Sequence, residues 1–329
     1  MPDAAFEAVF SQETLARQDA RGRQLLDDLQ AMVPVLRERS RAAEEAGRIP
    51  DKTIDDLHRI DAFRAVVPES YGGMEVTFPI IPQIFRVLGR GCMSTGWSMG
   101  FLIYHNFQFA HYPKELQDLT FGGRGFTMAA GQVMPSGQAE RVDGGFKLNG
   151  RWGYATGIYH SDYMALAAPM AGEETPDGKP VMYRFAVPVE EFEILDTWHV
   201  AAMKATGSHD VTLTDVIVPE CNGIPVEQLR ERTSPGLDVN LGPLWRVPLL
   251  SFMSFGAVGP LVGAADAMLE IVSEILETKV GAYSGDRQQG LMTQRVRLAA
   301  IRTEHVATVG LYESKIDELW DMIVRGETP

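Results

Sequence analysis

Apolar residues recur every three or four positions through the first third of the chain, which is the periodicity of one helix face. The clearest run has apolar residues at Leu25, Leu29, Met32, Val33 and Leu36. Gly47 and Pro50 are expected to end this helix. Shorter helices are expected at 50–60, at 79–89, at 94–110 with Ser94, Thr95 and Gly96 as capping residues, and at 113–121 with Leu116 and Leu119 facing inward. The pattern predicts an all-α N-terminal domain over residues 1–124.

The pattern changes at Gly125 to short alternating runs that are separated by Gly, Pro, Asp and Asn. These runs lie at 146–148, 163–168, 183–187, 211–213 and 216–218. Several strands at this spacing are typical of a small β-sandwich or barrel, so we expect a middle β domain over residues 125–222. In the run at 145–149 the alternation ends at Asn149-Gly150, which predicts a hairpin turn there.

The strand that follows this predicted turn carries Trp152, Tyr154 and Thr156 at alternate positions. In an extended chain, residues two apart face the same way, so these three side chains should line one surface. Two aromatic rings beside a hydroxyl suit a planar ring ligand. An ordinary half-buried strand is the simpler interpretation of the pattern alone, and the pattern leaves both open.

The last third of the chain is helical again. After a loop-like linker at 223–244, apolar residues at helical spacing fill 258–277 and 293–324, which predicts a C-terminal helical domain over residues 223–329. Two long amphipathic helices form only a hairpin, and each needs more apolar surface covered than the other supplies. Either the N-terminal helices and a partner subunit complete the bundle, or a C-terminal piece is absent from this sequence.

Composition narrows the function classes. The chain has 329 residues, 45% of them hydrophobic, and a net charge of −14 that no long run of one sign accounts for. This balance argues against nucleic acid and anionic membranes as partners. Cys92 and Cys221 match no metal spacing, and the acidic start lacks an apolar signal region. Because Pro and Gly interrupt the longest apolar stretch, at 247–265, we expect no membrane span and a cytoplasmic location.

Common catalytic motifs are missing from the sequence. It has no G-x-G-x-x-G after a strand, no Walker A and no H-E-x-x-H. The seven histidines do not cluster at metal-ligand spacing. His105 follows Trp97 by eight residues on a predicted helix, so the two should share a face, although a structural histidine is the better interpretation of that observation alone.

Four segments carry a family resemblance. They are RIPDKTIDDLHRIDAFRAVVPESYGG at 48–73, GCMSTGWSMGFLIYHN at 91–106, VMPSGQAERVDGGFKLNGRWGYATGIYHSDY at 133–163, and DTWHVAAMKATGSHDVTLTDVIVP at 196–219. Together they resemble the acyl-CoA dehydrogenase fold. Within that fold they resemble the oxygenase components of two-component flavin-dependent monooxygenases (group D), which hydroxylate phenols and other aromatics. The Asp-Thr-Trp-His and Thr-Gly-Ser-x-Asp elements favour this hydroxylase branch, and the resemblance runs from about residue 25 to the end.

The resemblance implies an α+β multidomain fold and a reaction. Reduced flavin (FADH2 or FMNH2) and O2 would hydroxylate a small aromatic substrate through a C4a-hydroperoxyflavin. A separate NAD(P)H:flavin reductase would supply the reduced flavin, because the sequence has no nicotinamide fingerprint. A homo-oligomer, dimer or homotetramer, is expected. Relatives continue for further helices that carry another catalytic histidine and flavin contacts, and this sequence lacks them.

The resemblance also implies roles for particular residues. His105 would take or orient a phenol proton, which is worth roughly 10²–10⁴ in rate. Thr156, where relatives usually carry Ser, would accept a hydrogen bond from the flavin N5–H. Gln132 stands where relatives have a small hydroxyl residue, which predicts a different cavity. The flavin contacts would be Trp97, Gln132, Trp152, Tyr154, Thr156, Gly157, Thr206 and Ser208, with Arg295 as a phosphate-binding candidate or part of a solvated basic face. The substrate contacts would be His105, Asn106 and His160.

Two other functions remain open at this stage. An acyl-CoA dehydrogenase of the same fold needs a carboxylate base at the substrate's α-carbon, and no Glu in the sequence stands out for that role; the Trp97/His105 pair favours the hydroxylase. A catalytically impaired flavin-binding scaffold is the second alternative, which the short C-terminal region makes plausible.

Overall fold

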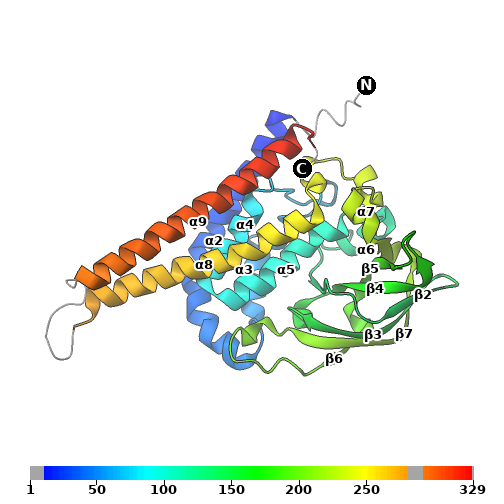
Figure 1. The fold of residues 1–329 in the computed structure, drawn as a ribbon, viewed down its shortest axis with the longest axis horizontal. Helices are drawn as coiled ribbons and strands as arrows, with labels where there is room; N and C mark the ends of the chain where they lie inside the picture. Colours follow the sequence, from blue (N-terminus) through cyan, green and yellow to red (C-terminus); the bar gives the residue numbers. More distant parts are fainter. Residues whose placement is uncertain (1–10, 281–291, 328–329) are drawn as a thin grey trace.

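The computed structural model describes residues 11–280 and 292–327. Its N-terminal part is helical, as the apolar periodicity predicted. The helices are α2 (Gln12–Ala46), α3 (Asp51–Arg59), α4 (Ile80–Gly91), α5 (Met93–Phe109) and α6 (Lys114–Phe121). In Figure 1, α5 lies between the strands and the long helix α8. Helix α5 is therefore the central element of the molecule.

The ends of α2 follow from local chemistry. The Ser11 side chain accepts a hydrogen bond from the backbone N–H of Thr14 and so caps the first turn. Gly47 ends the helix in the left-handed conformation, with φ of 68°. Leu25, Leu29 and Leu36 are buried, which confirms the predicted helix face.

Two details of the predicted helices were wrong. Ser94 does not cap α5, because the helix begins right after the extended residue Cys92 and Ser94 already lies inside it, donating to the Glu44 carboxylate. Leu119 does not face inward: its side chain is 64% exposed, while Leu116 is fully buried. Helix α6 is only two turns long, so a shift of one residue in phase turns a side chain outward.

The middle of the chain folds into an eight-stranded sheet among the described residues. The order is β6-β7-β3-β2-β4-β5-β8, and β1 pairs with β4 in parallel. The strands are β1 (Ala129–Gly131), β2 (Gln138–Val142), β3 (Gly145–Ala155), β4 (Tyr163–Glu174), β5 (Pro180–Pro188), β6 (Glu193–Leu195), β7 (His209–Pro219) and β8 (Gly223–Pro225).

The predicted hairpin turn at Asn149-Gly150 was wrong. Strand β3 runs straight through these residues, and the turn that joins β2 to β3 lies at Asp143-Gly144 instead. The β3–β7 ladder shifts register between Leu148 and Gly150, so the glycine marks an irregularity within the strand. Both dipeptides carry a hairpin signature, and only the pairing partners decide between them.

The linker expected at 223–244 is also more structured than predicted. It begins with β8, which pairs with β5, and continues into the short helix α7 (Val226–Glu231). Helix α8 (Leu249–Thr278) then starts earlier than the expected 258, and α9 (Met292–Val324) matches its expected range closely. In Figure 1, α8 and α9 run beside each other and extend beyond the rest of the molecule.

Helix α8 packs on α4 through small residues. A Cβ on Gly263 would stand 1.9 Å from the Arg86 carbonyl oxygen, and one on Gly259 would stand 2.5 Å from that of Pro82. Of the described helices, α8 alone has the length and apolar composition to cross a membrane, which is weak evidence for a span. Its close backbone contact with α4 is instead typical of a bundle helix.

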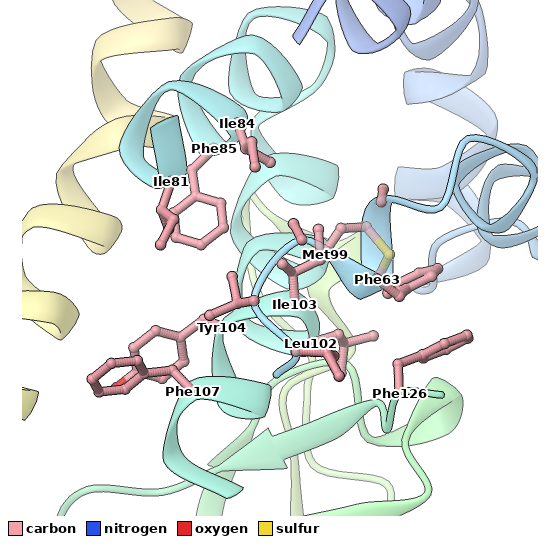
Figure 2. Packing of buried hydrophobic residues seen from close by; sticks show 14 of the residues in the cluster. Phe63, Ile81, Ile84, Phe85, Met99, Leu102, Ile103, Tyr104, Phe107 and Phe126 are labelled. Carbon is pink, nitrogen blue, oxygen red and sulfur yellow. The ribbon is translucent and has the colours of Figure 1, made fainter. Parts of the chain in front are cut away.

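Buried apolar side chains gather around α5. Figure 2 shows Met99, Leu102, Ile103, Tyr104 and Phe107 of this helix together with neighbours from α4, the 62–64 turn and the chain just before β1. A second cluster lies within the sheet and includes Phe146, Trp152 and Phe185. Because α5 borders both the helical core and the sheet, its side chains can bring residues from distant parts of the chain together.

Candidate active site

One face of α5 lies along the β domain. Leu102, His105 and Gln108 follow each other at three-residue intervals. A Cβ on Gly157 would touch Leu102, Nδ1 of His105 lies 2.6 Å from the Ala129 carbonyl oxygen, and Gln108 accepts a hydrogen bond from Arg184. Three separate parts of the β domain therefore meet on this single helix face.

His105 is buried and its tautomer is fixed by its neighbour. Because a carbonyl oxygen can only accept, Nδ1 carries the proton that goes to Ala129, and Nε2 keeps its lone pair. A Cβ on Gly131 would stand 2.1 Å from Nε2, so this nitrogen faces bare backbone. Burial, and then the positive charge of Arg184, lower the pKa of His105 to about 3. At neutral pH the imidazole is neutral and offers Nε2 as a hydrogen-bond acceptor.

Three side-chain hydroxyls form a hydrogen-bonded chain near the start of the α5 face that contacts the β domain. Thr206 donates to the Met203 carbonyl oxygen at 2.9 Å, and Ser208 donates to Thr206 at 2.9 Å. The Thr156 and Ser208 oxygens are 2.9 Å apart. Each hydroxyl has one proton, and those of Thr206 and Ser208 are already used, so Thr156 must donate to Ser208. Both lone pairs of the Thr156 oxygen are then left to accept a hydrogen bond from a ligand.

The turn that holds this chain is anchored by α2. The Glu44 carboxylate accepts from the backbone N–H groups of Lys204 and Ala205, at 2.9 and 3.3 Å. Gly207 adopts a φ of 51°, which places Thr206 and Ser208 on the same side of the turn as Thr156. The backbone N–H of Gly157 donates to the Thr206 carbonyl oxygen at 2.9 Å, which ties the turn to β3.

Arg184, on β5, is the most unusual charged group near His105. Only 6% of the residue is exposed, and its guanidinium donates to neutral oxygens: the Gln132 carbonyl, the Gln108 amide at 2.8 Å and the Ala165 carbonyl at 3.4 Å. Its Nε has no hydrogen-bond partner. Burial lowers the pKa of this guanidinium from its ordinary value.

Two cavities share Met253 of α8 as a lining residue. The larger has a volume of about 300 Å³ and is lined by Arg184, by apolar side chains of β4, β5, α7 and α8, and by the loop after β1. The smaller lies between α5 and α8 and is lined by Trp97, Phe101 and Tyr104, among others. The ring of Phe101 stacks over His105 at 6.0 Å between centroids. The walls are therefore aromatic on one side and aliphatic on the other.

The prediction that Trp152, Tyr154 and Thr156 share one face was wrong. A bulge between Trp152 and Ala155 breaks the alternation, and Tyr154 adopts a φ of 60°. Trp152 is fully buried in the sheet, where its indole N–H donates to the Ala167 carbonyl oxygen at 3.0 Å. Tyr154 is 68% exposed and lies edge-on to Trp198. Of the three, the structure places only Thr156 in the hydroxyl chain.

Other predicted residues lie apart from the His105 group or are fully engaged. Asn106 is buried, donates to backbone carbonyls that include Ile103, and accepts from the backbone N–H of Thr127, which leaves no obvious atom for a substrate. A nitrogen of His160 lies 2.9 Å from the Ile49 carbonyl oxygen, in the α2–α3 turn. Arg295 is exposed on α9. Gln132 lies in the loop after β1, with its side chain bonded to the Met134 backbone N–H at 2.7 Å.

Sequence reasoning missed Arg184, Gln108 and Tyr104. A charge inside the apolar run at 181–187 was the available signal for Arg184, because a strand buried on both faces seldom carries one. Gln108 and Tyr104 gave no signal of their own. Tyr104 is buried without a hydrogen-bond partner for its hydroxyl, and burial raises its pKa above the ordinary value.

Comparison of this sequence with known proteins finds relatives that are enzymes. No family model matches the chain. A pigment production hydroxylase from a Rhodococcus species is 31% identical over 279 residues, which cover 84% of this chain and 70% of the relative. The oxygenase subunit HsaA of a flavin-dependent monooxygenase from Rhodococcus jostii is 28% identical over 91% of this chain and 78% of the relative. The oxygenase component of p-hydroxyphenylacetate 3-hydroxylase from Acinetobacter baumannii is 28% identical over 92% and 70%.

Comparison of structures gives the same group. XiaF from a Streptomyces species, solved in complex with FADH2 and glycerol, superposes with a TM-score of 0.86 at 27% identity. The match covers 95% of this chain and 79% of XiaF. The bound reduced flavin belongs to that protein.

Proposed function

The chain belongs to the oxygenase components of two-component flavin-dependent monooxygenases, which have an acyl-CoA dehydrogenase-like fold, and we propose that it hydroxylates a phenolic or other aromatic substrate with reduced flavin and O2. The observation that carries this proposal is the acceptor left open on Thr156. A flavin in its reduced form carries a proton on N5 that needs such an acceptor.

The residues present fit the flavin. The proton order of the three hydroxyls leaves the Thr156 oxygen able to accept from a ligand but not to donate to it, and the Tyr104 hydroxyl and the Arg184 Nε have no hydrogen-bond partner. A bound reduced flavin would supply the two electrons that activate O2, so that one oxygen atom is transferred to the ring and the other leaves as water. We propose that Thr156 holds the N5 proton in place and that Gly157, Thr206 and Ser208 support it. Trp97 and the exposed ring of Tyr154 are proposed as further flavin contacts.

His105 is proposed to orient the substrate. With Nδ1–H bonded to Ala129, Nε2 would accept a hydrogen bond from the phenol O–H and so increase the electron density of the ring. Full transfer of this proton is disfavoured, because the imidazolium would be buried beside Arg184. We therefore propose that Nε2 of His105 accepts a hydrogen bond from the phenol O–H without taking its proton, in place of the general-base role expected from sequence.

The cavity walls exclude water. Trp97 and Phe101 meet edge-on at 5.0 Å between centroids, and Tyr104 lies edge-on to Phe101 at 5.9 Å. These rings and Met253 border the small cavity on the α5–α8 side. This cavity has a volume of only about 10 Å³, too small for a substrate ring, so its rings close the α5–α8 side against water.

Further proposals concern partners and organisation. We propose a separate NAD(P)H:flavin reductase as the source of reduced flavin, a cytoplasmic location, and a helical–β–helical division at residues 124 and 222. A homo-oligomer, dimer or tetramer, is supported by large apolar side chains that are exposed on α8 and α9. These are Leu261, Met268, Ile271, Val272, Ile275, Val296, Ile301, Val306 and Leu311.

The test is anaerobic loading followed by oxygen. Chemically reduced FAD or FMN is bound to the protein, oxygen is added with and without simple phenols, and both the return of oxidised-flavin absorbance and the products are followed. The proposal expects delayed reoxidation and a product heavier by one oxygen atom. Reduction of a dye by acyl-CoA substrates would instead indicate a dehydrogenase. Flavin binding without either reaction would indicate a scaffold.

A further inference from the structure

The turn that carries the hydroxyl chain has no cap of its own. It spans residues 204–206, and Met203 before it has a left-handed backbone, with φ of 56°, and provides no capping side chain. The first backbone N–H groups of a helical turn have no partner within the turn, so they need an acceptor from outside. The Glu44 carboxylate of α2 is that acceptor, for Lys204 at 2.9 Å and for Ala205 at 3.3 Å. A side chain that is 160 positions away in the sequence therefore caps this turn.

Glu44 is unfavourable for its own helix. It lies in the last turn of α2, which ends at Ala46 and has no basic residue there. The C-terminal end of a helix carries partial negative charge, so an acid at this position opposes the helix dipole. The neighbouring Glu45 pairs with Arg41 at 2.9 Å on the exposed surface. Glu44 instead accepts from the turn and from the Ser94 hydroxyl of α5, so its carboxylate joins two helices to the turn.

The Met203 carbonyl oxygen fixes the direction of the hydroxyl chain. It accepts from the Thr206 hydroxyl at 2.9 Å and from the Trp198 indole N–H at 3.2 Å. A carbonyl oxygen cannot donate, so the proton order of Thr206, Ser208 and Thr156 follows from this end point. If Met203 left its left-handed conformation, the acceptor would move away, and the Thr206 hydroxyl would be free to donate to Ser208 instead. The Thr156 hydroxyl would then be free to turn its proton towards a ligand.

We propose that Glu44 is a positioning residue for the flavin site, which holds the 204–206 turn so that Thr156 accepts a hydrogen bond from the flavin N5–H. The proposal rests on the proposed hydroxylase function and adds a residue to it. Glu44 acts through the turn, the Met203 carbonyl and the hydroxyl chain, without contact to the flavin or the substrate. A helix of the N-terminal domain thereby sets the hydrogen-bonding state of an atom in the β domain.

The first measurement needs no flavin. Glu44→Gln keeps the shape of the side chain but replaces one carboxylate oxygen by an NH2 group, which cannot accept from a backbone N–H. Amide hydrogen–deuterium exchange, followed by mass spectrometry, should be at least about tenfold faster in peptides that cover 203–208, since hydrogen bonds to a charged group are worth that much. Peptides from β4 should exchange at the wild-type rate.

Two control variants separate the cap from its surroundings. Glu45→Gln removes an acid from the same helix end but not from the turn, so exchange of the turn should stay at the wild-type rate. Ser94→Ala removes the bond from α5 and keeps both N–H contacts of Glu44, so exchange of the turn should again stay near the wild-type rate.

The second measurement asks whether Glu44 acts through Thr156. Protein loaded with chemically reduced FAD is mixed with oxygen, and flavin reoxidation is followed by stopped-flow absorbance for Glu44→Gln, Thr156→Val and the double variant. Glu44→Gln should speed reoxidation at least about threefold, within the range of one lost hydrogen bond. The double variant should match Thr156→Val within about twofold, because Thr156→Val removes the atom that Glu44 positions. Independent effects would multiply instead.

Three results would overturn the proposal. The first is wild-type exchange of the turn in Glu44→Gln. The second is faster exchange with wild-type reoxidation, which would show a purely structural cap, and the third is a double variant whose effects multiply. If Glu44→Gln fails to fold, Glu44→Asp, which is one methylene shorter, replaces it and should change both rates in the same direction. Neither measurement uses an aromatic substrate, so a failure of hydroxylation leaves both results intact and the two proposals can fail separately.

Discussion

The direction of the Thr156 hydroxyl proton decides whether this side chain accepts a hydrogen bond from a ligand or donates one to it. Thr156→Val removes the acceptor with little change in shape, so flavin should still bind while the N5 proton loses its partner. We expect faster flavin reoxidation and a fall of about tenfold or more in product formed per flavin oxidised, the size of one lost hydrogen bond in a buried site. Stopped-flow absorbance and product analysis measure the two quantities.

Thr156→Ser is the matched control for this change. Ser keeps the hydroxyl and its bond to Ser208, so product yield should stay near the wild-type level. A valine protein that reoxidises flavin at the wild-type rate would show that Thr156 does not hold the N5 proton.

The buried histidines predict how stability depends on pH. The pKa of His105 falls to about 3 and that of His111 to about 4 on folding, both through burial. Below pH 6.5 the unfolded chain takes up protons that the folded chain does not, so stability falls as pH falls. By pH 5 each histidine should cost about 2 kcal/mol, at about 1.4 kcal/mol for each pH unit below 6.5.

Glu75 has the opposite effect on the pH dependence of stability and provides a check on it. Burial raises its pKa to about 7, so the folded chain binds its proton first and gains stability as pH falls from 7 towards 4.5. Glu75→Gln removes this gain. Its urea unfolding free energy should therefore fall more steeply between pH 7 and pH 5 than that of the wild type, and equal slopes would contradict the assignment of Glu75 as a neutral buried acid.

At the residue scale, sequence reasoning singled out side chains by residue type and family position, and it missed side chains that are unusual because they are buried. Thr156 and His105 were singled out, and the structure gives each an open acceptor atom. Trp152 and Tyr154 were placed on a common face because an extended strand was assumed, and a bulge separates them. Arg184 stayed hidden because its significance is the absence of an acid around it, which no linear pattern shows.

At the scale of elements, helices were predicted well and strand pairing was not. The end of α2 and the range of α9 were close to those observed, whereas α2 begins at Gln12, well before the predicted apolar run at 25–36. Strand pairing depends on contacts between distant segments. The choice between Asp143-Gly144 and Asn149-Gly150 as the hairpin turn is settled only by the partner strand, and β8 was missed because three residues carry too little pattern.

The contact between α4 and α8 predicts a sharp response to one methyl group. A Cβ on Gly263 would stand 1.9 Å from the Arg86 carbonyl oxygen, so Gly263→Ala must push the helices apart. We expect a loss of about 1–3 kcal/mol in unfolding free energy, the usual cost of overpacking. Gly310→Ala in α9 is the control, since nothing lies within 4 Å of its Cβ and helix propensity should raise stability by about 1 kcal/mol. If both variants melt alike, the close packing of α4 and α8 is wrong.

At the scale of the whole molecule, the site is assembled by α5 from parts of the chain that are far apart. Ala129, Gly157 and Arg184 meet the same helix face although each comes from a different strand region. The helical–β–helical order could be predicted from periodicity, because that pattern is local. The insertion of α5 between the sheet and α8 could not be predicted, because it depends on which surfaces pack against each other (Figure 1).

The exposed apolar side chains of α8 and α9 predict the assembly state. Met268, Ile271 and Ile275 recur on one face of α8 and are 62%, 44% and 47% exposed. Contiguous apolar surface of this kind marks an interaction site, and a second copy of the chain is the expected partner.

Light scattering should therefore give a molar mass that is a multiple of 36.3 kDa. Met268→Lys combined with Ile275→Lys should lower it to 36.3 kDa, because two buried charges would oppose the contact. Ile217→Lys, on an exposed position of β7, should leave the mass unchanged. A wild type that is monomeric at micromolar concentration would rule out this assembly.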